Sequence, residues 1–157
     1  MFREVRRIRQ ALPAEESLAV LEKAKRGVLS LTDGEWPYGM PLNHYYCRED
    51  GKIYFHCGFG GHREEILKQN PRVSYCVMDE GKKREGDWAL QFESVIVFGT
   101  VSFVEDHEKV LEISRRLSRK FTEDEAYIEE EVRNSGARTN MFAITIEHMT
   151  GKRVNEK

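Results

Sequence analysis

Residues 53–67, IYFHCGFGGHREEIL, place a strand, a glycine-rich turn and the start of a helix next to one another. The first residues are aromatic or β-branched, which favours a strand. Glycines at 58, 60 and 61 then allow the backbone conformations that a sharp turn requires. Helix formers follow from Arg63 until Pro71 ends them. The stretch therefore predicts a helix that begins directly after an open glycine turn.

The start of this helix has the features of a phosphate-binding site. The first N–H groups of a helix have no partner within it, and that end of the dipole is positive. His62 and Arg63 fall in the first turn, where a cation is disfavoured by about 0.3–1 kcal/mol unless an anion lies nearby. Residues 61–63 are therefore predicted to form a phosphate seat.

Two common nucleotide sites do not match this stretch. It lacks the Gly-Lys-Ser/Thr ending of a P-loop, so nucleoside triphosphate hydrolysis is not indicated. It also lacks the complete Gly-x-Gly-x-x-Gly spacing of a Rossmann dinucleotide site. The prediction is therefore a phosphate seat of another kind.

Composition excludes several classes of protein. The chain has 157 residues, which suits one domain, and 39% of them are apolar. A formal charge of −2 does not favour nucleic-acid binding. Because there is no apolar run of 18 residues and no apolar leader behind the first Met, we expect no membrane partner and a cytoplasmic location.

The three cysteines are an odd number without zinc spacing, so free thiols and no bound metal are predicted. Ligation of a metal by His56, Cys57 and His62 remains the minor alternative. The basic run at residues 115–120 is interpreted as a solvated helix face, with contact to an anionic ligand as its alternative.

The order of predicted elements indicates one domain over residues 1–157. A helical segment covers residues 1–26, with a helix that starts at Pro13. Pro41 lies inside a predicted strand, so that strand should be at an edge or should bend. Strands at hairpin spacing with few helices predict a small antiparallel barrel decorated by helices. The expected strands cover residues 28–32, 38–46, 53–57, 72–78, 92–104 and 140–148, and the expected helices follow residues 62, 105 and 122.

Seven segments stand in a characteristic order along the chain. They are residues 27–30 (GVLS), 37–43 (PYGMPLN), 53–57 (IYFHC), 61–63 (GHR), 70–74 (NPRVS), 93–99 (ESVIVFG) and 146–152 (IEHMTGK). Together they resemble the FMN-binding split-barrel proteins related to pyridoxamine 5′-phosphate oxidase, and within them the nitroimidazole-reductase branch. The resemblance covers residues 27–152 and implies a mainly β fold with α, a six-stranded antiparallel split β-barrel with flanking and inserted helices. It also implies a homodimer with FMN in grooves between the subunits.

The resemblance also assigns site residues. Gly61, His62 and Arg63 match the positions that hold the flavin phosphate, where one of the family's two cations is a histidine in this chain. His56 matches a cofactor-binding residue at the strand end beside the flavin, and it is also the residue that we expect nearest to the acceptor, as the catalytic side chain. The remaining cofactor-binding residues implied by the resemblance are Cys57 beside His56, Ser94 on the long strand, and Pro41, Leu42, Asn43 and His44 along the flavin ring.

One departure from the family bears on function. The oxidases of the family end with a tryptophan and arginines that grip pyridoxine phosphate, and this chain has no such ending. We therefore expect an FMN-binding oxidoreductase that reduces nitroimidazole-like or other small flat acceptors, and not pyridoxamine phosphate oxidation. A flavin- or haem-binding carrier or sensor without turnover is the alternative, and FAD or a deazaflavin could replace FMN.

Overall fold

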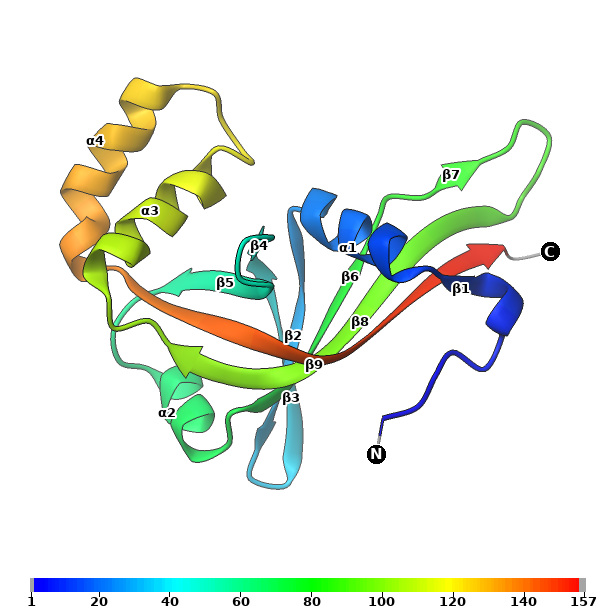
Figure 1. Ribbon diagram of the computed structural model, residues 1–157, viewed down its shortest axis with the longest axis horizontal. Coiled ribbons are helices and arrows are strands. Elements are labelled where there is room, and N and C mark those ends of the chain that lie inside the picture. The colour runs from blue at the N-terminus through cyan, green and yellow to red at the C-terminus, as the bar shows by residue number, and fades with distance from the viewer. Residues whose placement is uncertain (1, 156–157) are drawn as a thin grey trace.

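The computed structural model describes residues 2–155 as a mainly β protein (Figure 1). One antiparallel sheet has the strand order β3-β2-β6-β8-β9-β5-β4, and its two edge strands, β3 and β4, are not paired with each other. The predicted six-stranded split barrel with flanking helices is therefore confirmed. The six long strands are β2 (Arg26–Asp33), β3 (Trp36–Asn43), β5 (Lys52–Cys57), β6 (Arg72–Met78), β8 (Leu90–Phe103) and β9 (Asn140–Asn155).

Three short strands extend the sheet. They are β1 (Ala11–Leu12) on β9, β4 (Tyr45–Cys47) on β5 and β7 (Lys82–Lys83) on β8. His44 separates β3 from β4, so the single strand expected over residues 38–46 is two strands. Pro41 lies in β3, whose partner among the described strands is β2 alone, and the prediction of an edge strand is confirmed.

Four α-helices flank the sheet. α1 (Ala14–Lys23) begins after Pro13, as predicted, and carries Glu15 and Glu16 in its first turn, where the dipole favours anions. None of the described helices has both the length and the apolar character needed to cross a membrane. The other helices are α2 (His62–Gln69), α3 (His107–Ser118) and α4 (Glu125–Ser135), with 3-10 turns at Ile8–Gln10 and Gly136–Arg138.

The hairpin of α3 and α4 extends from one end of the sheet (Figure 1). Arg115 of α3 makes two hydrogen bonds to Glu129 of α4, and Arg119 makes two to Glu125. These residues belong to the basic run that the sequence placed on a solvated face. Because acids of the same hairpin pair with these two arginines, both arginines link α3 to α4.

The pairing of β8 with β9 is the longest in the sheet, from Gln91 opposite Asn155 to Phe103 opposite Phe142. Its register shifts between Phe98 and Gly99. A side chain at position 99 would collide with the carbonyl oxygen of Thr145, so glycine allows the two backbones to approach at this bulge. β9 has sixteen residues and ends at Asn155, further than the strand predicted to end at residue 148.

One side of the sheet carries an apolar surface, which we call the outer sheet face. Pro41, Val28, Cys76, Ile96 and Thr150 are successive cross-strand partners over five strands. Val28 is 44% exposed and Ile96 is 40% exposed. Met78 and Phe98, on whose ring Phe2 stacks, are further large apolar side chains exposed on this face.

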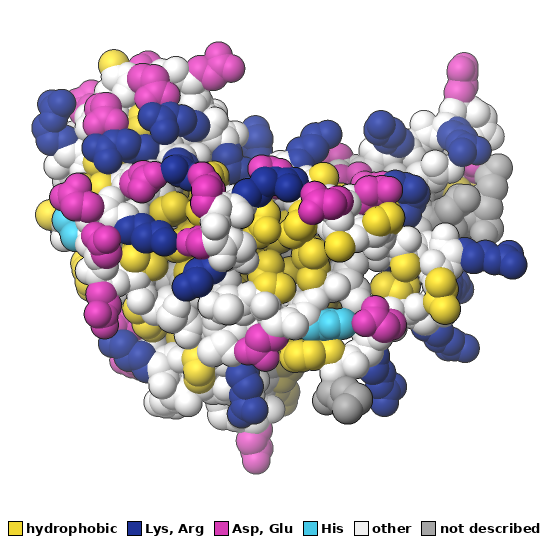
Figure 2. Space-filling model, viewed as in Figure 1, with side chains coloured by type: hydrophobic (Ala, Val, Ile, Leu, Met, Phe, Trp, Pro, Cys, Tyr) yellow, Lys and Arg dark blue, Asp and Glu magenta, His cyan; other side chains and the backbone are white. Residues whose placement is uncertain are grey.

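The molecule is hollowed between the α3–α4 hairpin and the region of α1 (Figure 2). Apolar side chains gather in the middle of the face shown, and charged side chains surround them. An apolar area with a charged rim is typical of a surface that another molecule covers.

Candidate functional site

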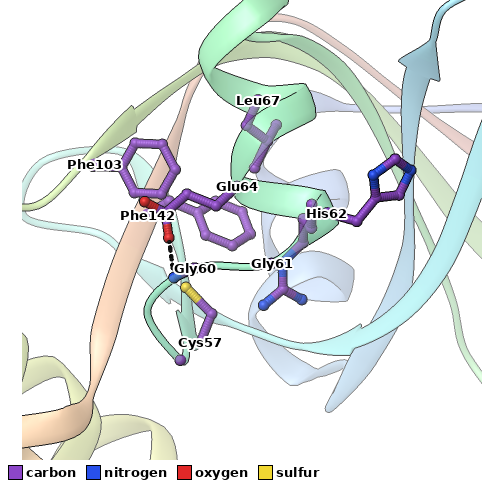
Figure 3. A pocket seen from close by; sticks show the side chains of 10 residues that line it. Cys57, Gly60, Gly61, His62, Glu64, Leu67, Phe103 and Phe142 are labelled. Atoms are coloured by element: carbon purple, nitrogen blue, oxygen red, sulfur yellow. Dashed lines mark hydrogen bonds between the residues drawn. The ribbon is translucent and has the colours of Figure 1, made fainter.

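A cavity of about 180 Å³ lies where β5 passes into α2 (Figure 3). The turn between these elements forms one wall, and the ends of β8 and β9 supply aromatic side chains to the other. The local sequence from Cys57 to Leu67 thus provides most of the lining residues, and the sheet brings the two phenylalanines to them. The lining residues are Cys57, Gly58, Gly60, Gly61, His62, Arg63, Glu64, Leu67, Phe103 and Phe142.

The glycine turn is open toward solvent. Gly60 has φ +72° and Gly61 has φ +109°, conformations that other residues rarely adopt. A Cβ atom at position 58, 60 or 61 would meet no other atom within 4 Å. Gly61 is the N-cap of α2 and offers no side chain to its first N–H groups. The turn therefore presents backbone donors to a space that an anion can enter.

Arg63 is a half-buried cation whose side-chain contacts are with uncharged groups. Its Nη1 lies 3.6 Å from the Met40 sulfur, and its guanidinium carbon lies 5.5 Å from the centre of the Phe142 ring. Among residues 2–155, no carboxylate forms a salt bridge with Arg63. Burial raises the pKa of the neighbouring Cys57 thiol, and the Arg63 charge acts in the opposite direction. The positive charge of Arg63 is thus available to a ligand.

Glu64 also lies in the cavity. Its Oε2 accepts the Gly60 N–H at 2.8 Å and an Asn140 amide N–H at 3.4 Å, and its Oε1 accepts Lys68 Nζ at 2.5 Å. The hydrogen bonds from Lys68 and then from the Gly60 N–H lower the pKa of Glu64. Figure 3 shows this side chain turned back over the glycine turn. A carboxylate therefore contacts the same backbone that an incoming phosphate would use.

His62 has a different partner from the one predicted. Its Nε2 lies 2.6 Å from Oδ2 of Asp33, the last residue of β2, and its ring tilts against Tyr38. In Figure 3 it points away from Glu64 and Phe142. The nearby Asp33 carboxylate gives the imidazole an acidic partner outside the cavity. Within one chain, Arg63 is consequently the basic side chain directed at the phosphate seat.

His44 is a correction to the predicted site, because its side chain is fully buried. Its Nε2–H donates to the Leu21 carbonyl at 2.7 Å, and its Nδ1 lies 2.8 Å from the Tyr75 hydroxyl. Burial, followed by the charge of Lys120, lowers the pKa of His44 to about 4. With both ring nitrogens engaged and no exposed surface, this residue holds α1 and β6 together and does not line a flavin.

The other predicted residues lie around the cavity. His56 is exposed, and because neighbours on a strand point to opposite faces, it faces away from the side where Cys57 lines the cavity. Desolvation lowers the pKa of His56, and Arg63 acts in the same direction. Pro41, Leu42 and Asn43 follow Met40 along β3 and are partly accessible.

Ser94 is not brought to the cavity by the single chain. It lies near the start of β8, opposite Met78 and Lys152, whereas the cavity wall uses Phe103 at the other end of that strand. The predicted contact between Ser94 and the cofactor would therefore have to occur outside this cavity.

Some residues of the site were absent from the sequence prediction. The lining residues Phe103 and Phe142, and Asn140, which contacts Glu64, are distant from α2 in the sequence, and strand pairing brings them to it. Glu64 carried a local signal, because a glutamate at the third helical position commonly bonds back to the residue before the helix. No three His, Cys, Asp or Glu side chains in the described chain gather in a way that would hold a metal ion.

Comparison with known proteins decides the family. The sequence model described as pyridoxamine 5′-phosphate oxidase matches residues 13–153, which is most of the chain. The chain belongs to the pyridoxamine 5′-phosphate oxidase family. The resemblance recognised in the seven sequence segments is thereby confirmed for the superfamily. Comparison with curated protein sequences finds no match.

Solved structures share the fold of this family member. A candidate 5-nitroimidazole antibiotic resistance protein from Bacteroides thetaiotaomicron has a TM-score of 0.78 at 23% identity, over 92% of this chain and 87% of the other. An FAD-binding protein from Mesorhizobium loti has a TM-score of 0.67 at 25% identity, over 92% and 97%. A flavocytochrome from Azotobacter vinelandii has a TM-score of 0.74 at 16% identity, over 96% and 72%.

The buried His44 predicts an acid sensitivity of the fold. The unfolded chain takes up a proton near pH 6.5, whereas folded His44 resists protonation down to about pH 4. Stability should therefore fall as pH decreases from about 6.5 to about 4, by about 3 kcal/mol from this residue. Urea unfolding across this pH range should show a smaller loss for His44→Gln. Equal losses in both proteins would contradict this assignment.

Proposed function

We propose that this family member binds a flavin nucleotide, with FMN as the expected form, and reduces nitroimidazole-like or other small flat acceptors. The observation that carries the proposal is Arg63, a half-buried cation without a carboxylate partner in the described chain, beside an open glycine turn and a helix start. These groups fit the charge and size of a phosphate. Membership of the family and the FAD-binding protein of similar fold support the choice of a flavin.

The flavin ring needs a surface beyond the cavity. At about 180 Å³ the cavity is smaller than typical ligand sites of 300–1,000 Å³, so it suits the phosphate and not the whole cofactor. The Arg63–Met40 contact joins the seat to β3, where Pro41, Leu42 and Asn43 follow directly. We propose that the ring lies along these residues. This edge strand would then be covered by a second copy of the chain, which completes the site.

The outer sheet face supports a homodimer. Its exposed Val28, Ile96, Phe98 and Met78 form an apolar surface on the strands that continue from β3. An exposed apolar face of this kind favours unwanted association, and a second copy would remove it from water.

The roles of the protein in the reaction follow from these positions. A bound flavin supplies the redox chemistry. Arg63 would hold and neutralise its phosphate, and Phe103 and Phe142 would exclude water from one side of the seat. His56 has a lowered pKa, so a neutral imidazole is favoured near pH 7, and its N–H can donate a hydrogen bond to an acceptor.

The dimer predicts a mass of twice 18.4 kDa in light scattering at micromolar concentration. Ile96→Glu places a charge in the apolar face and should produce monomers. Tyr127→Glu changes an exposed residue of α4, away from this face, and should leave the dimer intact. A wild-type protein that is monomeric with flavin bound would refute the shared site.

The phosphate seat predicts that Arg63→Ala weakens FMN binding by about tenfold to a hundredfold, because a charge-assisted contact contributes about 1.5–3 kcal/mol. Riboflavin, which has no phosphate, should bind the variant and the wild type equally. Arg72→Ala, which removes an exposed arginine of β6, is the matched control. Flavin fluorescence titration provides the measurement. Equal losses for FMN and riboflavin would show that Arg63 supports the fold and not the phosphate.

Acceptor reduction is tested by mixing reduced flavin-loaded protein with a nitroimidazole in an anaerobic stopped-flow instrument. Reoxidation should be faster than that of free reduced FMN. His56→Ala should slow it by about a hundredfold if the imidazole assists proton transfer. FMN affinity should stay unchanged, because His56 faces away from the cavity side of β5.

His107→Ala, on the distant α3, is the control for this experiment. Reoxidation no faster than that of free reduced FMN would favour a flavin- or haem-binding carrier or sensor, and the colour of the purified protein would then identify the bound group.

A further inference from the structure

Glu64 places a negative charge inside the phosphate seat, and this charge has a consequence for the choice of cofactor. We propose that Glu64 is a charge filter that disfavours the doubly charged terminal phosphate of FMN relative to the singly charged phosphates of FAD. The proposal rests on the proposed flavin-binding function and concerns the nucleotide form that the seat accepts.

The first support is the position of the carboxylate. Oε2 lies 2.8 Å from the Gly60 nitrogen, in the open turn where an anionic ligand would find its backbone donors. The side chain is only 14% exposed, so water screens its charge weakly. A phosphate oxygen cannot accept the same N–H without displacing this carboxylate or lying beside it.

The second support is the way in which Glu64 is held from a distant element. Asn140, the first residue of β9 and itself buried, donates an amide N–H to the same oxygen at 3.4 Å. Lys68, one turn along α2, pairs with the other oxygen at 2.5 Å. These contacts keep the carboxylate in the seat, and Lys68 compensates part of its charge.

If Glu64 acted only as a helix cap, it would not need its negative charge. A glutamate at the third helical position often bonds back to the residue before the helix, and a glutamine does the same. The bond in this protein reaches Gly60, one residue beyond the N-cap Gly61. Glu64→Gln therefore retains a side-chain oxygen for the Gly60 N–H and removes only the charge, which separates the two roles.

The charge on its phosphate determines how strongly each nucleotide is repelled by Glu64. A terminal phosphate monoester carries about −1.5 to −2 at pH 7, whereas each phosphate within the FAD diphosphate carries a single charge. Repulsion by the Glu64 carboxylate grows with the ligand charge. The seat should therefore bind FMN less tightly than Arg63 and the helix start alone would allow, with a smaller penalty for FAD.

The experiment measures dissociation constants of FMN, FAD and riboflavin for the full chain by flavin fluorescence at one fixed salt concentration. Glu64→Gln should improve FMN binding by about tenfold relative to FAD, and riboflavin should change by less than about twofold. Glu65→Gln is the matched control, because this exposed neighbour in the same helical turn has no side-chain partner among the described residues. It should leave the FMN-to-FAD ratio within about twofold of the wild type.

A second variant tests for the opposite change in FMN affinity relative to FAD. Lys68→Met removes the cation that compensates Glu64 and should weaken FMN relative to FAD. Urea unfolding verifies that each variant is folded. An unchanged FMN-to-FAD ratio in both Glu64→Gln and Lys68→Met would overturn the filter and leave Glu64 as a helix cap. In contrast, a wild type that binds neither FMN nor FAD more tightly than riboflavin would overturn the phosphate seat itself.

Discussion

The long antiparallel pairing of β8 and β9 is the constraint on which the rest of the structure depends. β6 and β5 pair with its two outer sides, β1 and β7 extend its far end, and the sheet order follows from these contacts. The bulge at Gly99 allows the two strands to remain paired on both sides of a register shift. Where β8 ends and β9 begins, the same pairing places Phe103 and Phe142 side by side, and these rings form the apolar wall of the cavity.

The ionisable side chains around this cavity differ in the hydrogen-bond and salt-bridge partners that they have. His62 is paired with Asp33 outside the seat, and Glu64 is held by three donors inside it. The guanidinium of Arg63 lies near the sulfur of Met40, the face of Phe142 and the Cys57 thiol, and it forms no salt bridge within residues 2–155. A half-buried cation with such neutral neighbours gains more from an anionic ligand than a cation that is already paired. The phosphate seat therefore attracts an anion through Arg63 and repels it through Glu64. The balance between these two charges affects which anionic ligand binds.

The single chain has two exposed surfaces, and one explanation accounts for both. The cavity is too small for more than a phosphate-sized group, and the edge strand β3 next to it is open. The outer sheet face exposes apolar side chains on β2, β6 and β8, the strands that follow β3 in the sheet. A second copy on this face would bury the apolar surface and would also add a wall to the open groove along β3. The proposed cofactor site and the proposed dimer are thus two consequences of one unclosed sheet.

Local sequence determined the elements whose cause is local. The glycines and Pro71 define the turn and the end of α2, Pro13 starts α1, and Pro41 restricts β3 to an edge. The family was also readable, because its segments lie in order along the chain. Tertiary structure alone decided the environment of each side chain. His44 follows directly on predicted ring-binding residues but is buried between α1 and β6, and His62 turns to Asp33 instead of the phosphate seat. Burial and charge pairing depend on residues distant in the sequence, such as Tyr75, Asp33 and Asn140, so neighbouring residues alone could not predict them.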